Sequence, residues 1–321
     1  MAITDQIAME YAAVTESAGF LARPDIGVIA FDGDDAAEFL QGQLTNDVEG
    51  LEPGTGRYAA LLTPKGKVRA DMRVIRRSQV LLLLTEAERL PLVRKMIDTF
   101  RIGYRFTYED VGEQIALLSV IGPQARAVLS QTVGLLDGLG ENENDSAEIP
   151  ISDPPAAAIV TLVGIDVLGD PTVIAALADQ LRAAGVMEVS DAAAEIARVE
   201  AGIPRIGFEL DENTIPQEAG INGRAVNFEK GCYVGQETVA RLHYKGKPNR
   251  MLRGLRPETA VAPGAVITAP DGKELGHVGS AVVSPQYGPL ALAIIRREVE
   301  AGDSVDVDGV SALVTEPGVH P

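Results

Sequence analysis

The sequence has few of the residues that hold disulfides, metal ions or clusters. Its 321 residues include one cysteine, Cys232, three histidines and no tryptophan. A single cysteine excludes an intramolecular disulfide framework, because each bridge needs two thiols. So few thiols and imidazoles also lack the usual ligand set of a structural zinc site, or of an iron–sulfur cluster held by this chain alone. We therefore expect no permanently bound metal.

Long hydrophobic runs are missing as well. A membrane-spanning helix needs roughly 18 apolar residues, and runs such as residues 80–84 are far shorter. The first twenty residues include Asp5, Glu10 and Glu16 but no basic residue, so they do not resemble a signal peptide. We therefore expect a cytoplasmic protein without membrane association.

Basic residues are fewer than acidic ones. The chain has 28 Lys and Arg against 46 Asp and Glu, which gives a net charge of −18. This acidity argues against wholesale wrapping of nucleic acid or of an anionic membrane, but it leaves room for a local basic site. Hydrophobic residues make up 46% and charged residues 23%, the usage of a globular protein with a substantial core.

Hydrophobic periodicity and turn residues predict an α+β body. The expected helices cover residues 36–44, 91–100, 123–132, 171–184 and 192–200. The expected strands cover residues 57–62, 68–75, 80–85, 104–108, 114–121, 157–168 and 186–189. Residues 134–155 are rich in Gly, Asp, Glu, Asn and Pro, which is typical of a loop.

The pattern changes after Met251 to short β-rich runs separated by turns, with no long helical stretch. This spacing predicts a small barrel or sandwich of about 70 residues. Glycine and proline interrupt the pattern near residues 245–249, where we place a boundary. We therefore divide the chain into residues 1–115, 116–245 and 246–321.

The most informative stretch is residues 227–237, NFEKGCYVGQE. A helix is expected from about Val234 to Tyr244, so Cys232 would lie near a helix N-terminus and beside Lys230. Both features favour the thiolate and lower the pKa of a cysteine. A free cysteine more commonly packs as a small hydrophobic residue, and the physical arguments taken together leave both alternatives open.

Residues 230–237, KGCYVGQE, closely resemble the K-x-C-Y-x-G-Q-E signature of the YgfZ family. These folate-binding proteins are related to the aminomethyltransferase, or T-protein, of the glycine cleavage system (the GcvT superfamily). Other segments are similar to elements of this superfamily and stand in the same order: FLQGQLTND at 39–47, PKGK at 64–67, RVEAGIP at 198–204 and IPQE at 215–218. The octapeptide is specific, and the other segments support it.

The resemblance implies an α+β ring of three domains around a central channel for tetrahydrofolate, with a C-terminal β-barrel. Residues 1–115 would be the folate-binding region and residues 116–245 would carry the signature. Glu200 would hydrogen-bond the pterin, since a carboxylate can accept from an amino group and a ring N–H together. Without the resemblance, Glu200 would more commonly be a solvent-exposed residue at the end of a helix. Further candidate folate-binding residues are Arg198, Lys230, Tyr233, Gly235, Gln236, Glu237, Gln43 and Asp47.

Asp71 follows the turn at residues 65–67, where the transferases carry two adjacent aspartates, one of them a catalytic acid/base candidate. Here alanine precedes the single aspartate. The resemblance makes Asp71 a catalytic candidate beside Cys232, while the lost carboxylate argues against full aminomethyltransferase activity. Because Arg69 and Arg73 flank it, an ion-paired strand residue is an equal alternative.

Two basic clusters interrupt the acidic chain. One runs from Lys65 to Arg77, with six basic residues and one acid, and the other from Arg241 to Arg256, with six basic residues and no acid. Such clusters suit the carboxylates of a folate, including a polyglutamate tail, or the phosphates of tRNA. Runs of like charge usually form solvent-exposed faces. These two clusters, however, adjoin Asp71 and the Cys232 signature, so they predict a basic functional site.

Three functions are compatible with these features. The first is a YgfZ-type protein that binds tetrahydrofolate and supports the assembly, repair or activity of iron–sulfur enzymes, including tRNA-modifying ones. Cys232 alone cannot hold a conventional cluster, so a contact would be transient or shared with an iron–sulfur protein or assembly factor. The second is a tetrahydrofolate-dependent aminomethyltransferase or demethylase. The third is a non-catalytic adaptor for tRNA or protein, and the sequence leaves open whether the chain is an enzyme.

Overall fold

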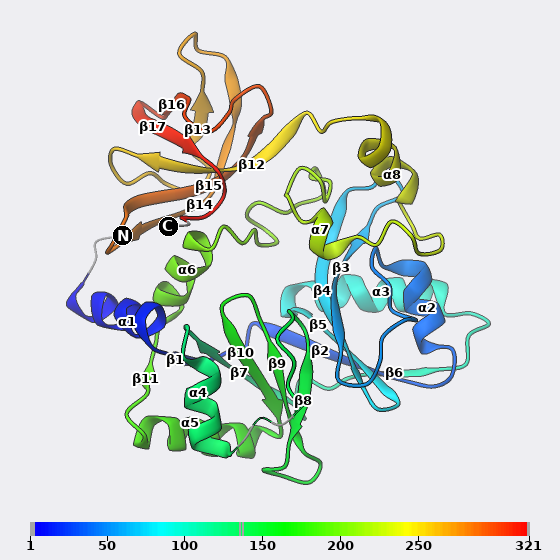
Figure 1. Cartoon of the computed structure of the whole chain (residues 1–321). Helices are drawn as coiled ribbons and strands as arrows, with labels where there is room; N and C mark the ends of the chain where they lie inside the picture. Colours follow the sequence, from blue (N-terminus) through cyan, green and yellow to red (C-terminus); the bar gives the residue numbers. More distant parts are fainter. Residues whose placement is uncertain (1–3, 135, 137, 320–321) are drawn as a thin grey trace.

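The computed structural model describes residues 4–134, 136 and 138–319. They form three bodies placed like the corners of a triangle (Figure 1). Two bodies are built on open sheets and the third is a closed barrel. The α+β class and the C-terminal barrel expected from the sequence are confirmed.

The first sheet has the strand order β3-β4-β5-β2-β6 and is antiparallel throughout. Its strands are β3 (Gly56–Leu62), β4 (Val68–Arg77), β5 (Val80–Glu86), β2 (Ile26–Asp32) and β6 (Thr107–Asp110). Apolar side chains of one face pack against helices α2 (Ala36–Gln43) and α3 (Leu90–Phe100). Because side chains alternate along a strand, the other face is left for different contacts.

The second sheet has the order β11-β1-β7-β10-β9-β8. Its strands are β11 (Met187–Glu188), β1 (Gly19–Ala22), β7 (Ala116–Ile121), β10 (Gly164–Gly169), β9 (Ala156–Val160) and β8 (Ser146–Ile149). Helices α4 (Ala125–Val133) and α5 (Pro171–Ala183) cover one face. The other face packs on the helix-free face of the first sheet, where Ile75 and Leu82 share a core with Leu117 and Ile159. This arrangement places the two sheets back to back between layers of helices.

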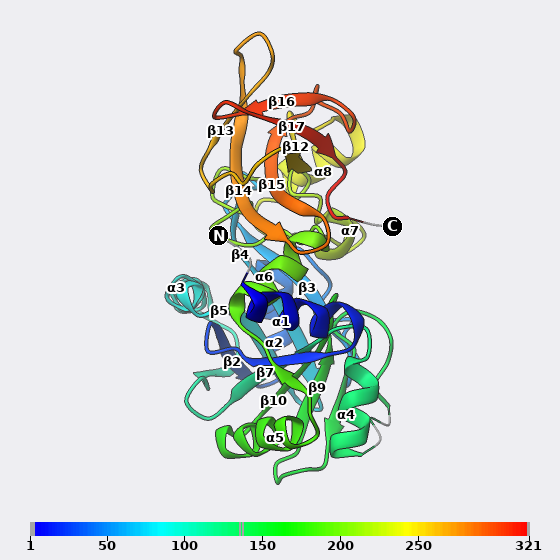
Figure 2. The same ribbon diagram turned by 90° about the vertical axis from the view of Figure 1, so that its left-hand side faces the viewer.

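The barrel closes in the order β12-β15-β14-β13-β16-β17 around its own apolar core. Its strands are β12 (Arg250–Pro257), β15 (Gly288–Arg296), β14 (Glu274–Ser284), β13 (Val266–Thr268), β16 (Ser304–Val307) and β17 (Val310–Thr315). Helices α1 (Asp5–Glu16) and α6 (Asp191–Glu200) contact each other, and α6 also contacts β14 and β15. Figure 2 shows both helices between the barrel and the sheets. The remaining short helices are η1 (Ala87–Arg89), α7 (Asn222–Ala225) and α8 (Gln236–Lys245).

Most of the expected helices and strands are confirmed to within a few residues, but three details are wrong. The loop expected at 134–155 contains β8, which pairs with β9. The single strand expected at 157–168 is two strands, because a turn in which Thr161 N donates to Gly164 O lies inside the apolar run. The strand expected at 104–108 begins at Thr107, since Tyr104 packs edge-on against Phe39 instead.

The barrel strands lie within residues 246–321, whereas segments on either side of residue 115 belong to both sheet bodies. Strand β1 belongs to the second sheet, between β11 and β7. Ile206, Leu210 and Val239 pack against Tyr58 and Leu62 of the first sheet. The division into 1–115, 116–245 and 246–321 thus remains a division of the sequence. The two sheet bodies each include residues from both sides of position 115. None of the helices in the described residues is both long and apolar enough to cross a membrane.

Candidate functional site

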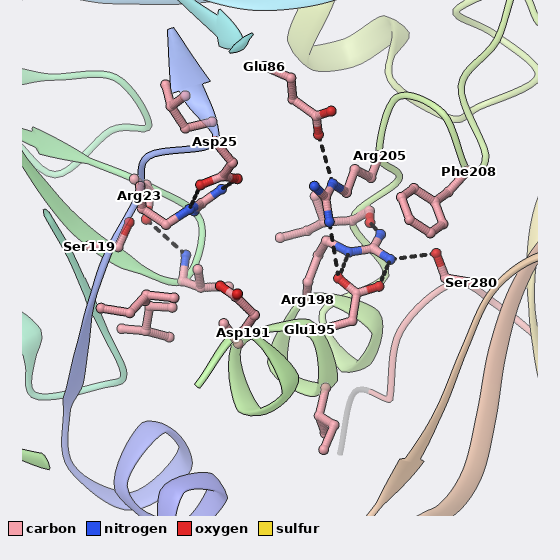
Figure 3. A pocket seen from close by; sticks show the side chains of 18 of the residues that line it. Arg23, Asp25, Glu86, Ser119, Asp191, Glu195, Arg198, Arg205, Phe208 and Ser280 are labelled. Atoms are coloured by element: carbon pink, nitrogen blue, oxygen red, sulfur yellow. Dashed lines mark hydrogen bonds and ion pairs between the residues drawn. The ribbon is translucent and has the colours of Figure 1, made fainter. Parts of the chain in front are cut away.

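A cavity of about 1120 Å³ lies where the three bodies meet (Figure 3). Asp71 and Arg73 reach it from β4, and Ser119 and Asp166 from the second sheet. Helix α6 adds further side chains, and β14 closes the barrel side with Ser280. A cavity walled by several bodies, with polar groups converging on it, is the usual form of a small-molecule site.

Asp71 is placed at the cavity by the alternation of β4. Its neighbours Ala70 and Met72 belong to the core beneath α2 and α3, so the carboxyl group points to the opposite side. The hydroxyl of Tyr58, on the adjacent strand β3, donates to Asp71 Oδ2 at 2.7 Å. The guanidinium of Arg224 lies over the Tyr58 ring, 4.6 Å from its centroid.

The environment of Asp71 suits a group that exchanges protons. Burial raises the pKa of the Asp71 carboxyl, while the hydrogen bond from Tyr58 and the charge of Arg224 lower it only in part. Burial, and then the charge of Asp71, raise the pKa of Tyr58 well above its usual range. A carboxyl with a raised pKa in a cavity is a candidate general acid or base.

Ion pairs join the walls of the cavity. Arg205 Nε donates to Glu86 Oε1 at 2.7 Å and so links the segment after α6 to β5. Arg198 donates to both oxygens of Glu195, at 2.6 and 2.9 Å, and to Ser280 Oγ of the barrel at 2.5 Å. Figure 3 shows these bonds on one side of the cavity.

Arg23 and Asp25 form a second group, on the opposite wall in Figure 3. Arg23 donates both Nε and Nη2 to the carboxylate of Asp25, at 2.9 and 2.8 Å. Phe208, which is 43% exposed, also borders the cavity, and the guanidinium of Arg205 lies 5.1 Å from its ring centroid. The cavity therefore offers carboxylates, guanidinium groups and an open aromatic face.

The expectation of a basic working site is wrong. The lining holds more acidic than basic residues: Asp25, Asp71, Glu86, Glu143, Asp166, Glu188, Asp191 and Glu195 against Arg23, Arg73, Arg198, Arg205 and Arg224.

Half of the cations in the two basic clusters are paired with acids distant in the sequence. In the first cluster, Arg73 pairs with Asp166 at 2.5 Å and Arg77 with Glu148 at 3.2 Å. In the second, Arg250 pairs with Glu218 at 3.1 Å. Six of the twelve cations form no ion pair with another described residue, and all but the half-buried Arg76 are exposed: Lys65, Arg76, Arg241, Lys245, Lys247 and Arg256.

The signature KGCYVGQE lies outside the lining of this cavity. Lys230 Nζ donates to the backbone carbonyls of Gln41, Leu44 and Asn46, at 2.6, 2.7 and 3.0 Å. Burial lowers the pKa of Lys230 to about 8, and the charge of Asp47 partly opposes this effect. The lysine therefore ties the signature loop to the end of α2.

Gly235 fixes the other end of the loop. Its φ is +85°, and a Cβ atom there would lie 2.5 Å from the carbonyl oxygen of Thr63 and 3.1 Å from Gly66 Cα. The loop is thus packed on the turn between β3 and β4, and Tyr233 is buried beside it. Helix α8 begins at Gln236, and Glu237 is exposed in its first turn.

Cys232 is exposed at the surface of this loop. The thiol is therefore not packed as a small hydrophobic residue. The helix begins at Gln236 rather than Val234, and the ammonium of Lys230 is bound to backbone carbonyls. A reactive role for Cys232 stays a prediction.

In the described parts of the chain, no three His, Cys, Asp or Glu side chains gather as metal ligands do.

The other candidate positions are spread over different places. Glu200, at the end of α6, accepts from the hydroxyl of Tyr11 at 3.2 Å, while its Oε1 is buried without a hydrogen-bond partner. Burial raises the pKa of Glu200. Asp47 accepts from Gln41 Nε2 at 3.0 Å, and Gln43 has a buried, unpartnered Oε1. None of the three lines the cavity.

Sequence reasoning missed most of the cavity. Arg205 and Phe208 directly follow the RVEAGIP segment, so extending that segment by four residues would have included them. Arg23, Asp25 and Glu86 stand in no motif and are brought together by the meeting of β1, β2 and β5. Of the residues proposed from the sequence, Asp71 and Arg198 border the cavity.

Comparisons with known proteins agree with this geometry. The family model described as GCVT N-terminal domain matches residues 1–140. The tRNA-modifying protein YgfZ of Colwellia psychrerythraea is 27% identical over 233 residues, which cover 71% of this chain and 68% of that protein. An aminomethyltransferase of Rubrobacter xylanophilus is 29% identical over 306 residues, covering 93% and 82%.

A solved structure extends the match to the whole fold. Glycine cleavage system aminomethyltransferase T from Bartonella henselae is similar to this chain with a TM-score of 0.86 and 25% identity. The similarity covers 97% of this chain and 88% of that one. The motifs, the three bodies and these relatives together show that the chain is a member of the GcvT superfamily.

Proposed function

We propose that the chain is a YgfZ-type protein that binds tetrahydrofolate in the central cavity and supports tRNA-modifying and other iron–sulfur enzymes. The observation that carries the proposal is the cavity, walled by all three bodies of a GcvT-like fold. The YgfZ relative and the signature at residues 230–237 support the choice within the superfamily.

The lining residues fit a reduced folate. Cavity carboxylates such as Glu195 could accept from the amino group and ring N–H of a pterin, and guanidinium groups such as Arg205 could bind the glutamate carboxylates. Phe208 offers a face for the benzoyl ring. When bound, tetrahydrofolate would supply a nitrogen that carries one-carbon units. Of the folate-binding positions carried over from the family, Arg198 borders the cavity and Glu200 does not line it.

A titration of purified protein with folinic acid, a stable reduced folate, tests the ligand and the cavity. Wild type should bind, and Phe208→Ala should weaken binding roughly five-fold or more, because the ring loses its stacking face. Phe100→Ala is the matched control, since Phe100 is 51% exposed on α3 and does not line the cavity. Absence of binding by wild type, or equal losses in both variants, would refute the cavity assignment. Glu200→Ala measures in the same assay whether this carboxyl at the end of α6, outside the lining, contributes to binding.

The iron–sulfur part of the proposal depends on Cys232. Because this thiol is exposed and lies outside the cavity, Cys232→Ala should keep the folinic acid affinity of wild type. The same variant, as the only copy in a cell, should lower the activity of iron–sulfur enzymes such as those that modify tRNA. Unchanged enzyme activities in that strain would remove the thiol from the account.

An aminomethyltransferase activity is the second candidate, and the placement of Asp71 favours it. The carboxyl borders the cavity, has a raised pKa and is held by Tyr58, as a proton-transfer group would be. An assay of methylene-tetrahydrofolate formation from an aminomethylated carrier protein decides between the two functions. Turnover that Asp71→Asn abolishes would support the enzyme, and no turnover by wild type would remove it.

A further inference from the structure

One face of α8 and the residues after it combine unpaired cations with exposed aromatic rings. This surface, here called the α8 face, consists of Arg241, His243, Tyr244, Lys245 and Lys247. All five residues are exposed, and Tyr244 is 66% exposed. Figure 1 shows α8 at the outer edge of the molecule, where the chain leaves the first body for the barrel.

The aromatic rings of this face form a continuous group with the half-buried Phe228 beside it. Phe228 and His243 are stacked with ring centroids 3.7 Å apart and an interplanar angle of 14°. The ring of Tyr244 is 4.8 Å from that of His243 and nearly perpendicular to it. An aromatic ring that stays two-thirds exposed beside a stacked pair is a platform for a planar group from outside the chain.

The charges around these rings are positive and available. Between Thr238 and Arg250 the sequence has no acidic residue. Arg241, Lys245 and Lys247 form no ion pair with another described residue, whereas most of the first basic cluster is paired.

The dipole of α8 accounts for only some of these positive charges. It favours a cation such as Lys245 in the last turn, but Arg241 is in the middle of the helix. Arg241 lies three and four positions before Tyr244 and Lys245, so the three side chains are neighbours on one side of the helix. The acids close in sequence are Glu229 and Glu237, before and at the start of α8. In a chain with a net charge of −18, this side of α8 is suited to an anionic partner.

We propose that the α8 face binds single-stranded RNA, with an unpaired base stacked on Tyr244 and phosphates bound by Arg241, Lys245 and Lys247. Stacking requires bases that are not already paired, which favours a single strand or a loop over a duplex. The inference rests on the proposed function only for the identity of the RNA, namely a loop of a tRNA. The contact itself involves neither the cavity nor folate.

Fluorescence anisotropy with a labelled single-stranded RNA of about twelve nucleotides tests this proposal on the full chain. Wild type should bind at low salt and bind the corresponding duplex more weakly. Tyr244→Ala should weaken binding roughly ten-fold without changing the salt dependence, while Tyr244→Phe should bind as wild type does. The double variant Lys245→Gln, Lys247→Gln should reduce the slope of log affinity against log salt by roughly 1.4 in magnitude.

Lys95→Gln provides the matched control, because Lys95 is exposed on α3 and outside the α8 face. It should bind RNA as wild type does. Failure to bind single-stranded RNA at low salt would overturn the proposal and leave this face to a protein partner. Equal affinity for duplex and single strand, or full affinity in Tyr244→Ala, would also overturn it. The folinic acid titration remains a separate test, since either assay can fail while the other succeeds.

Discussion

The alternation of side chains along β4 determines which way the Asp71 carboxyl group points. Side chains on either side of it enter the apolar core, so the carboxyl has to face the cavity. There it is held by Tyr58 and surrounded by enough protein to raise its pKa. The ion-paired alternative does not describe this residue, because its flanking arginines pair elsewhere, Arg69 with Glu212 and Arg73 with Asp166.

The raised pKa of Asp71 predicts how stability depends on pH. Above pH 3.8, the ordinary pKa of this group, the unfolded chain releases the proton before the folded chain does. Ionising Asp71 in the fold therefore lowers the free energy of unfolding progressively, until the pH passes the folded-state pKa. Asp71→Asn cannot ionise, so its free energy of unfolding relative to wild type should rise over this pH range.

Urea denaturation at a series of pH values measures this difference. Glu113→Gln is the control, because Glu113 is an exposed carboxyl outside the cavity. A difference between Asp71→Asn and wild type that stays constant from pH 4 to pH 8 would contradict the raised pKa.

At the scale of elements, the signature loop is held between α2 and the β3–β4 turn. Lys230 binds three carbonyls at one end, and Gly235 packs on Thr63 and Gly66 at the other. These contacts account for the lysine and the second glycine of the signature by structure alone. Cys232 forms none of these contacts and is exposed.

Gly235→Ala should therefore destabilise the protein. The new Cβ atom would stand 2.5 Å from the Thr63 carbonyl oxygen, and an L-residue is strained at a φ of +85°. Together these effects should lower the free energy of unfolding by about 2 kcal/mol. Gly231→Ala in the same loop is the matched variant, because its Cβ atom would meet nothing within 4 Å. Thermal melting compares the two, and equal melting temperatures would show that the packing of Gly235 does not matter.

Local pattern predicts the elements well where periodicity is strong and where caps are present. Ser190 caps α6 as expected, accepting from Ala193 N. The same approach misses the turn between β9 and β10, because Gly164 at its end stands inside a run that is apolar on both sides. It also leaves residues 4–34 unassigned, although α1, β1 and β2 lie there.

The cavity is harder to predict because its residues meet only in the tertiary fold. Asp71 and Arg198 could be proposed, since family motifs contain them. Arg73 looked like part of a basic site, yet its partner Asp166 stands on another sheet and 93 residues away. Net charge along the sequence therefore gave the wrong sign for the cavity.

At the scale of the whole molecule, the described residues of three bodies wall the central cavity, and the signature loop lies outside its lining. Arg198–Ser280 joins α6 to the barrel, and Arg205–Glu86 joins the segment after α6 to the first sheet. A ligand that spans the cavity would contact all three bodies. It should therefore stabilise their mutual arrangement in proportion to its binding free energy.

Hydrogen–deuterium exchange with and without saturating folinic acid tests this account most directly. Folinic acid should slow exchange in the segments that wall the cavity, β4, β5 and α6, and leave the signature loop and α8 unchanged. The same measurement on Phe208→Ala, at equal ligand concentration, should show weaker protection. Protection confined to residues 230–245, or none in β4, β5 and α6, would contradict folate binding in the central cavity.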